Sequence, residues 1–262
     1  MGLLDKLARR LRGPRCPVEP TQRIWVERRL LWLLEEFGPD PLRRDPLAPG
    51  STYLPDSWEG SEDDCLDLVD QLCAFMQIGR ETLDVELYDS EENSARHLLP
   101  VHEWTHSGPA GLFQSGSIQG RFTLGIDVAG LGDPRSLAAT ICHELGHVHL
   151  LGHGHLDPEA EDQERVTDLL TVFFGAGIFT ANSAFQFSQW QDGQMQGWSA
   201  RRLGYLTERE FGYALACYAR LRGERQPEWA SFLDENIRYF LDESAFFLER
   251  TAETSVPFGV SS

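Results

Sequence analysis

The sequence predicts an α+β fold, in which a small sheet of about three strands packs on one strongly marked helix and the C-terminal part is mainly helical. Three observations lead to this prediction. Apolar residues recur at helical spacing before residue 80 and again after residue 133. Between them, β-forming residues alternate or cluster in short runs, and glycine, serine and asparagine separate those runs.

Two helices are expected in the N-terminal part, residues 21–80. Residues 22–37 repeat apolar positions three and four apart and stop at Gly38, and a proline-rich connection follows. Residues 62–78 begin with three acidic side chains, which suit the N-terminal end of a helix because they oppose its dipole, and this second helix stops at a glycine.

The middle part, residues 81–180, is expected to hold the sheet and two helices. The predicted strands lie near residues 82–89, 111–114 and 121–128. Asp133 and Pro134 then provide an N-cap and a first-turn proline for the most clearly marked helix of the chain. A further helix is expected from about residue 159 to residue 175.

The C-terminal part, residues 181–262, is expected to be mainly helical, with helices near residues 207–222 and 228–248. Together the three parts make one domain, residues 21–262, because a chain of this length can bury a single large core. Residues 1–20 stand apart from it as a basic, amphipathic N-terminal segment.

Composition limits the partners and the compartment. A net charge of -18 argues against a nucleic-acid partner, since a polyanion would be repelled by most of the surface. The five cysteines are an odd number and form no CxxC pair, so neither a disulfide framework nor a thiolate zinc site is expected. No stretch reads as a signal peptide or a membrane span, and we therefore expect a cytoplasmic protein. The oligomeric state stays open.

The N-terminal tip differs in charge from the rest of the chain. Residues 1–15 hold five basic side chains against Asp5 alone, and their leucines fall at helical spacing. A weak contact of this segment with an anionic membrane surface is one interpretation. A terminal helix that frays, or that docks on its own domain, is the other.

One motif carries the predicted chemistry. His143, Glu144 and His147 match HExxH, and on a helix two histidines four residues apart face the same point and can bind one metal ion. Glu144 lies beside them, where it can accept a proton from a metal-activated water without being a ligand. Leu137 and Ile141, with Leu145 and Val148, form an apolar stripe that is expected to face the core separately from the site.

A second HExxH match spans residues 102–106, but it is expected to be a coincidence. Pro100 precedes it and Gly108 and Pro109 follow it, so no helix long enough to bring its histidines one turn apart is predicted there.

A catalytic zinc site usually has three protein ligands, and Glu164 is the preferred third one. It lies with Glu161 and Asp168 on the polar stripe of the helix at residues 159–175, whose other face is strongly apolar. Carboxylates on so apolar a helix are costly to bury unless they meet a cation, and zinc would be that cation. Asp168, one turn later, could fix the tautomer of a ligand histidine. The alternative is that these acids only solvate an outer helix face.

His153 is the competing third ligand. It follows His143 by ten residues, which is the ligand spacing of the metzincin pattern HExxHxxGxxH. Leu150 stands where that pattern needs glycine to turn the chain back onto the metal, although Gly152 could supply a later turn. Met195 is the candidate for the methionine turn of such a site.

The motif HELGH, followed after seventeen residues by Glu164 and then by Asp168, resembles the HExxH and ExxxD arrangement of gluzincin metallopeptidases. This resemblance, over about residues 134–175, implies a zincin-like fold with zinc on His143, His147 and Glu164.

The resemblance also implies Glu144 as the base and Asp168 as the orienting acid. A later tyrosine, Tyr205 or Tyr213, would stabilise the oxyanion, and an extended substrate would lie along the strand at residues 121–128.

The sequence therefore predicts a zinc-dependent metallopeptidase or amidase that hydrolyses peptide bonds in a peptide or protein substrate, with Glu144 as general base. Three alternatives remain at this point. The chain could be a noncatalytic zincin-fold binding protein, a metzincin-type peptidase that uses His153, or a helical interaction module in which the motif is accidental.

Overall fold

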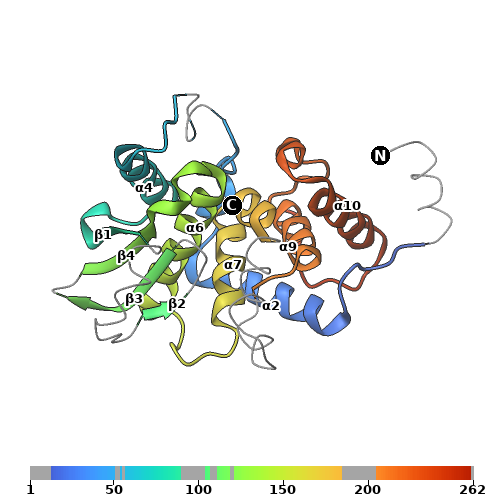
Figure 1. Ribbon diagram of the computed structural model, residues 1–262. Coiled ribbons are helices and arrows are strands. Elements are labelled where there is room, and N and C mark those ends of the chain that lie inside the picture. Colours follow the sequence, from blue (N-terminus) through green and yellow to red (C-terminus); the bar gives the residue numbers. More distant parts are fainter. Residues whose placement is uncertain are drawn as a thin grey trace, which may run out of the picture.

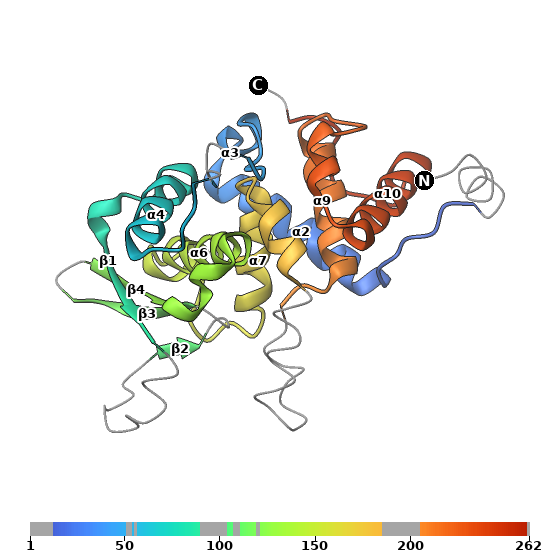
Figure 2. The same cartoon turned by 45° about the horizontal axis from the view of Figure 1, so that its top comes forward.

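The structure is a computed structural model that describes residues 13–50, 54, 57–89, 104–106, 111–118, 121–184 and 205–260 (Figure 1). These residues form a mainly helical α+β fold, as predicted, with one small sheet at one end and a cluster of helices beside it (Figure 2). Residues 1–12 and Met195 lie outside the described residues, so the predictions made for them have no structural counterpart here.

The N-terminal helices form where the sequence predicts them. Helix α2 spans Pro20–Phe37 and helix α4 spans Glu62–Met76, and the connection between them contains a short helix, α3, at Asp40–Arg43. A capping box starts α4: the Ser61 hydroxyl accepts a hydrogen bond from the Asp64 amide at 3.1 Å, and the Asp64 carboxylate accepts one from the Ser61 amide at 3.0 Å.

The sheet has four strands, one more than predicted, in the order β1-β4-β3-β2. The expected strands are β1 (Leu83–Tyr88), β3 (Gly111–Ile118) and β4 (Arg121–Asp127). β1 and β4 are parallel, whereas β3 pairs antiparallel with β4. Residues 121–128 cannot pair with an extended substrate as the resemblance implies, because β4 is paired on both sides, with β1 and with β3.

The additional strand, β2, spans Trp104–His106 and pairs antiparallel with β3. It lies inside the second HExxH match, so the last three residues of that match are extended and cannot present a helical pair of histidines. The prediction that this match is not a helical metal motif is therefore confirmed. A strand of three residues gives too short a pattern to be recognised from sequence alone.

Helix α6 (Pro134–His147) carries the first motif and starts as predicted. The Asp133 carboxylate accepts a hydrogen bond from the Ser136 amide at 3.2 Å, and Pro134 occupies the first turn. The helix runs on through a wider π-type turn, Val148–Gly152, that is closed by a hydrogen bond from the His153 amide to the Val148 carbonyl at 3.2 Å.

Helix α7 spans Gln163–Phe173, and residues 177–184 are also helical. Helix α9 spans Glu208–Leu221 and helix α10 spans Glu235–Arg250, after a 3-10 turn at Glu228–Phe232. These C-terminal helices lie at the end of the molecule opposite the sheet (Figures 1 and 2). None of the described helices is both long and apolar enough to cross a bilayer.

Helix α6 is buried on every side from Leu137 to His147, since it contacts α4, α7 and the sheet. Its apolar stripe is buried in the core as predicted, and the face that carries the histidines is buried as well. The histidines and Glu144 are also enclosed, which makes their polar atoms dependent on partners inside the protein.

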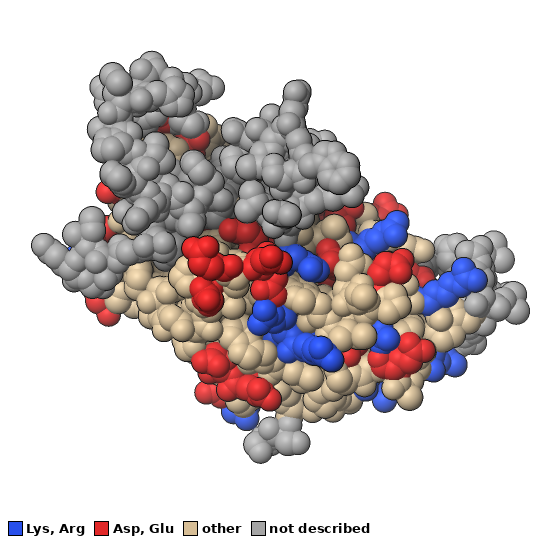
Figure 3. Space-filling model, turned by 90° about the horizontal axis from the view of Figure 1, so that it is seen from below, with Lys and Arg blue, Asp and Glu red and all other residues tan. Residues whose placement is uncertain are grey.

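On the face shown in Figure 3, the described acidic and basic side chains are interspersed, and the basic ones do not gather into a single large patch. The absence of a nucleic-acid partner stays a prediction from the net charge.

Candidate metal centre

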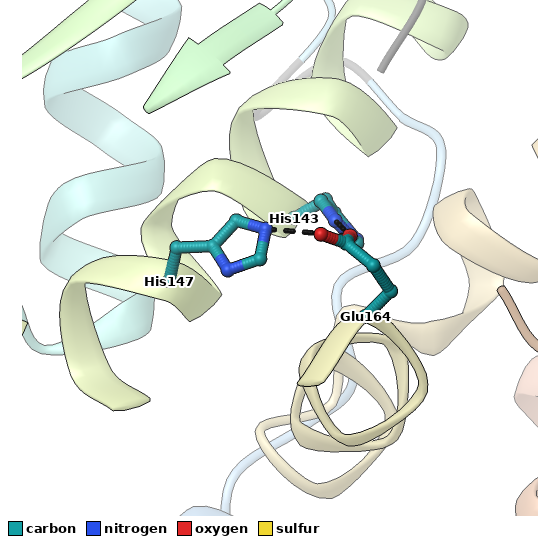
Figure 4. Close-up of side chains that lie close together, drawn as sticks. All are labelled: His143, His147 and Glu164. Atoms are coloured by element: carbon teal, nitrogen blue, oxygen red, sulfur yellow. Dashed lines mark hydrogen bonds and ion pairs between the residues drawn. The ribbon is translucent and has the colours of Figure 1, made fainter. Parts of the chain in front are cut away.

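Helices α6 and α7 bring together two histidines and one carboxylate. One ligand atom each from His143, His147 and Glu164 lies within 4.8 Å of the others, and such a group could hold a metal ion (Figure 4). The Glu164 Oε2 atom is 3.0 Å from His143 Nε2 and 3.5 Å from His147 Nε2. No second group of this kind is found within the part of the chain that the structure describes.

Asp168 lies behind His143, on the side away from Glu164. Its Oδ1 atom is 2.9 Å from His143 Nδ1, and its Oδ2 atom accepts a hydrogen bond from the Leu206 amide at 2.8 Å. A carboxylate in this position keeps the proton of the imidazole on Nδ1, so that Nε2 is the nitrogen directed at Glu164.

Thr167 fixes the tautomer of His147 in a similar way. Its hydroxyl donates to the Gln163 carbonyl at 3.0 Å and lies 3.3 Å from His147 Nδ1. Because its single proton is used on the carbonyl, the hydroxyl can only accept at the imidazole. His147 therefore carries its proton on Nδ1 and turns Nε2 toward the same point as His143.

Gly146 allows the two helices to approach so closely. A Cβ atom at this position would lie 2.8 Å from Thr167 Cγ2, which is too close for a carbon contact. The missing side chain lets the first turns of α7 reach the histidines. The sequence motif HExxH places no requirement on this residue, so its role was not predicted.

The buried charged groups of the site shift one another's pKa values. Burial alone would lower the pKa of His143, but hydrogen bonds and charges from Asp168 and Glu164 outweigh it and raise that pKa to about 10. Burial favours the neutral form of Glu164, yet His147 and His143 together lower the pKa of Glu164 to about 2. Burial raises the pKa of Asp168, and His143 offsets this only in part. A protonated His143 thus donates two hydrogen bonds, from Nδ1 to Asp168 and from Nε2 to Glu164.

Glu144 is completely buried on α6, next to the histidines. The negative charge of Glu144 helps to raise the pKa of two tyrosines. The pKa of Tyr88 is raised to about 12, mainly by burial and then by Asp127 and Glu144. The pKa of Tyr205 is raised by burial and then by Glu164, Glu144 and Asp168. Both phenols stay protonated at neutral pH and can donate hydrogen bonds.

The two tyrosines proposed as oxyanion donors occupy different places. The Tyr205 ring packs edge-on against His143, with centroids 5.2 Å apart, so this residue borders the metal group. Tyr213 instead donates a hydrogen bond to Glu27 Oε1 at 2.5 Å, in a separate buried network. Tyr88, at the end of β1, was not identified from the sequence as a neighbour of Glu144, because it belongs to no motif.

The other histidines after the motif lie away from the group. His153 packs against Phe122 and His149, with centroids 6.1 and 5.8 Å apart, and is not one of the clustered ligands. The chain turns only at Gly154, where φ is 74°, after His153 has already passed the site. His155 pairs with Glu36 at 2.7 Å.

His149 is buried in the core. Its Nε2 atom donates a hydrogen bond to the Met76 carbonyl at 2.6 Å. Burial lowers the pKa of His149 to about 4, so this residue is a neutral part of the core.

Comparison of the chain with protein-family models, with curated proteins and with solved structures finds no match.

Proposed function

We propose that this protein is a zinc-dependent hydrolase of peptide bonds, a metallopeptidase or amidase with Glu144 as general base. One observation carries the proposal. Two imidazole nitrogens and one carboxylate oxygen converge on a single point, and a buried carboxylate that is not among them, Glu144, stands beside them on the same helix. A purely structural metal site has no use for that additional acid.

The donor set fits zinc better than other common ions. Two histidines and one carboxylate are a frequent set for catalytic zinc, which keeps a fourth position for water or substrate. Calcium and magnesium take mostly oxygen donors, and a structural zinc site is usually closed by four protein ligands. The contacts of His143 Nδ1 with Asp168 and of His143 Nε2 with Glu164 also indicate a place where positive charge is stabilised.

Zinc, when bound, would polarise a substrate carbonyl and acidify a coordinated water. The other steps belong to the side chains. Glu144 accepts the proton of the attacking water and can pass it to the leaving amine. Asp168 holds the Nδ1 proton of His143. Tyr205, whose raised pKa keeps its hydroxyl protonated, can donate a hydrogen bond to the negative charge that develops on the carbonyl oxygen.

We also propose that the fold belongs with the zincins. A small sheet precedes the helix that carries HExxH, and the following helix supplies a glutamate, which is the order that the gluzincin resemblance implies. A cytoplasmic location is supported by the free cysteines, of which four are buried.

The test replaces Glu144 by glutamine, which keeps the size of the side chain but accepts no proton. We expect Glu144→Gln to retain one zinc per chain and to lose peptide hydrolysis by about a hundredfold to ten-thousandfold. The substrate would be a mixed peptide library read by mass spectrometry, with and without chelator. Glu161→Gln, an exposed acid two residues before α7, is the matched control and should keep both zinc and turnover.

Three results would count against the proposal. A Glu144→Gln variant as active as the wild type would remove this residue from its role. Zinc binding without any cleavage in the wild type would favour a noncatalytic binding protein. A wild-type protein that takes up no zinc, even when zinc is added, would end the hydrolase interpretation.

A further inference from the structure

Glu164 stands in the first turn of α7, which is the weakest place in a helix. The first turn has amides without partners inside the helix, and helix ends fray. The N-cap residue, Asp162, makes no side-chain hydrogen bond to this turn. The helix by itself therefore does not secure the carboxylate that converges on His143 and His147.

Asp162 uses its carboxylate on helix α2 instead. Its Oδ2 atom accepts a hydrogen bond from Trp25 Nε1 at 2.8 Å and one from Arg29 Nε at 3.0 Å. Arg29 Nη2 donates to both carboxylate oxygens, at 2.7 and 2.9 Å. The Arg29 and Asp162 side chains are only 30% and 23% exposed, so the pair is partly shielded from solvent.

Arg165 holds the other side of the same turn. Its guanidinium lies over the Trp25 ring, 4.0 Å from the ring centroid, and its Nη2 atom donates to Glu210 Oε1 at 2.5 Å. Glu210 is buried and closes the capping box of α9 with Thr207. Glu164 therefore lies between two residues that are both anchored on Trp25.

We propose that Trp25, Arg29, Asp162 and Arg165, here called the α2 clamp, are positioning residues that hold Glu164 in place for metal binding. The clamp touches neither the histidines nor a reacting atom. It acts by keeping the first turn of α7 formed, and its effect on metal affinity rests on the proposed zinc site.

The positions of Trp25 and Arg29 on α2 explain why this helix can hold the first turn of α7. Trp25 and Arg29 are one helical turn apart and face α7 together, while residues 153–162 before α7 form no regular helix or strand. Without the clamp, the position of Glu164 would depend on the loop that precedes α7. With it, the ligand is fixed to a helix of eighteen residues.

The experiment compares Asp162→Ala, Trp25→Phe and the conservative Asp162→Asn. Trp25→Phe keeps a ring under Arg165 and removes only the indole donor. Asp70→Asn, which breaks the exposed Arg80–Asp70 pair at 2.6 Å, is the matched control. Zinc affinity is measured by competition with a chromophoric chelator. The visible absorption of the Co²⁺-loaded protein reports the geometry of the ligands.

We expect Asp162→Ala to lower zinc affinity by about ten- to a hundredfold and to alter the Co²⁺ spectrum, as loss of an orienting contact does. Trp25→Phe should give a smaller loss, Asp162→Asn should restore part of the affinity, and Asp70→Asn should change neither readout.

Hydrogen exchange of the metal-free proteins separates the clamp from the metal site. In Asp162→Ala the amide of Val166, which donates the first hydrogen bond of α7 to the Asp162 carbonyl, should lose protection while the amides of α10 keep it. Unchanged protection in this turn would overturn the clamp, and so would a loss of protection throughout the chain, which would indicate a general structural role. A wild type that binds neither Zn²⁺ nor Co²⁺ would overturn the zinc site itself.

Discussion

Zinc binding should displace a proton from His143, and this makes the affinity depend on pH in a way that the structure specifies. Between its two carboxylates the pKa of His143 is about 10, so nearly every metal-free molecule carries this proton at neutral pH. Zinc needs the neutral imidazole and must compete with it. At pH 7, three units below that pKa, the competition costs about a thousandfold in affinity, or about 4 kcal/mol.

The prediction is that apparent zinc affinity rises by about tenfold per pH unit between about pH 7 and pH 9, through His143 alone. Competition titrations with a chelator of known pH dependence, and calorimetry in buffers of different ionisation enthalpy, measure the slope and the protons released. Glu164 adds nothing to this slope, because its pKa of about 2 keeps it ionised throughout.

Asp168→Asn is the control, since the amide cannot hold a protonated imidazole as the carboxylate does. Its slope should be shallower above pH 7. Protons released by a coordinated water appear in both proteins and cancel in the comparison. Equal slopes for the wild type and for Asp168→Asn would refute the conclusion that Asp168 helps to raise the pKa of His143.

The same shift has a consequence for stability. Because the pKa of folded His143 lies above its ordinary value of 6.5, its stabilising effect is complete below about pH 6.5 and is lost as pH rises through about 10. The metal-free protein should therefore unfold more easily as pH rises across this range, and zinc should weaken that dependence.

Three further predictions concern the same group of residues. Glu164→Ala should lower zinc affinity severely while His153→Ala leaves it nearly unchanged; the reverse result in a metal titration would support the metzincin interpretation. Asp168→Ala should reduce affinity or turnover by about ten- to a hundredfold, and a silent variant would remove its orienting role. Gly146→Ala should destabilise the fold by about 1–3 kcal/mol in denaturant unfolding, because its Cβ would meet Thr167; unchanged stability would show that α7 can shift freely.

The sequence was informative where a local signal decides the structure. Asp133 and Pro134 mark the start of α6, and the four-residue spacing of His143 and His147 places both on one side of it. The polar positions of the next helix predicted that Glu164 and Asp168 would share a face, and they contact His143 from that face. In each case the signal lies within a few residues of the feature.

What the sequence did not reveal depends on contacts between distant segments. Glu144 is far from Tyr88 in sequence but close enough to help raise its pKa, and Tyr213, which was a candidate oxyanion donor, instead donates a hydrogen bond to Glu27. Trp25 lies far from the motif in sequence but anchors the turn that carries Glu164. Local periodicity carries no information about such tertiary partners.

The most direct test of the proposed zinc site is a crystal structure of the zinc-loaded protein, with anomalous scattering recorded on both sides of the zinc absorption edge. We expect one zinc ion bound by His143 Nε2, His147 Nε2 and a Glu164 oxygen, each at about 2.0–2.2 Å, with Glu144 near the open position but not bound. A zinc ion held by His153 in place of Glu164, or an anomalous map with no peak between α6 and α7, would contradict it.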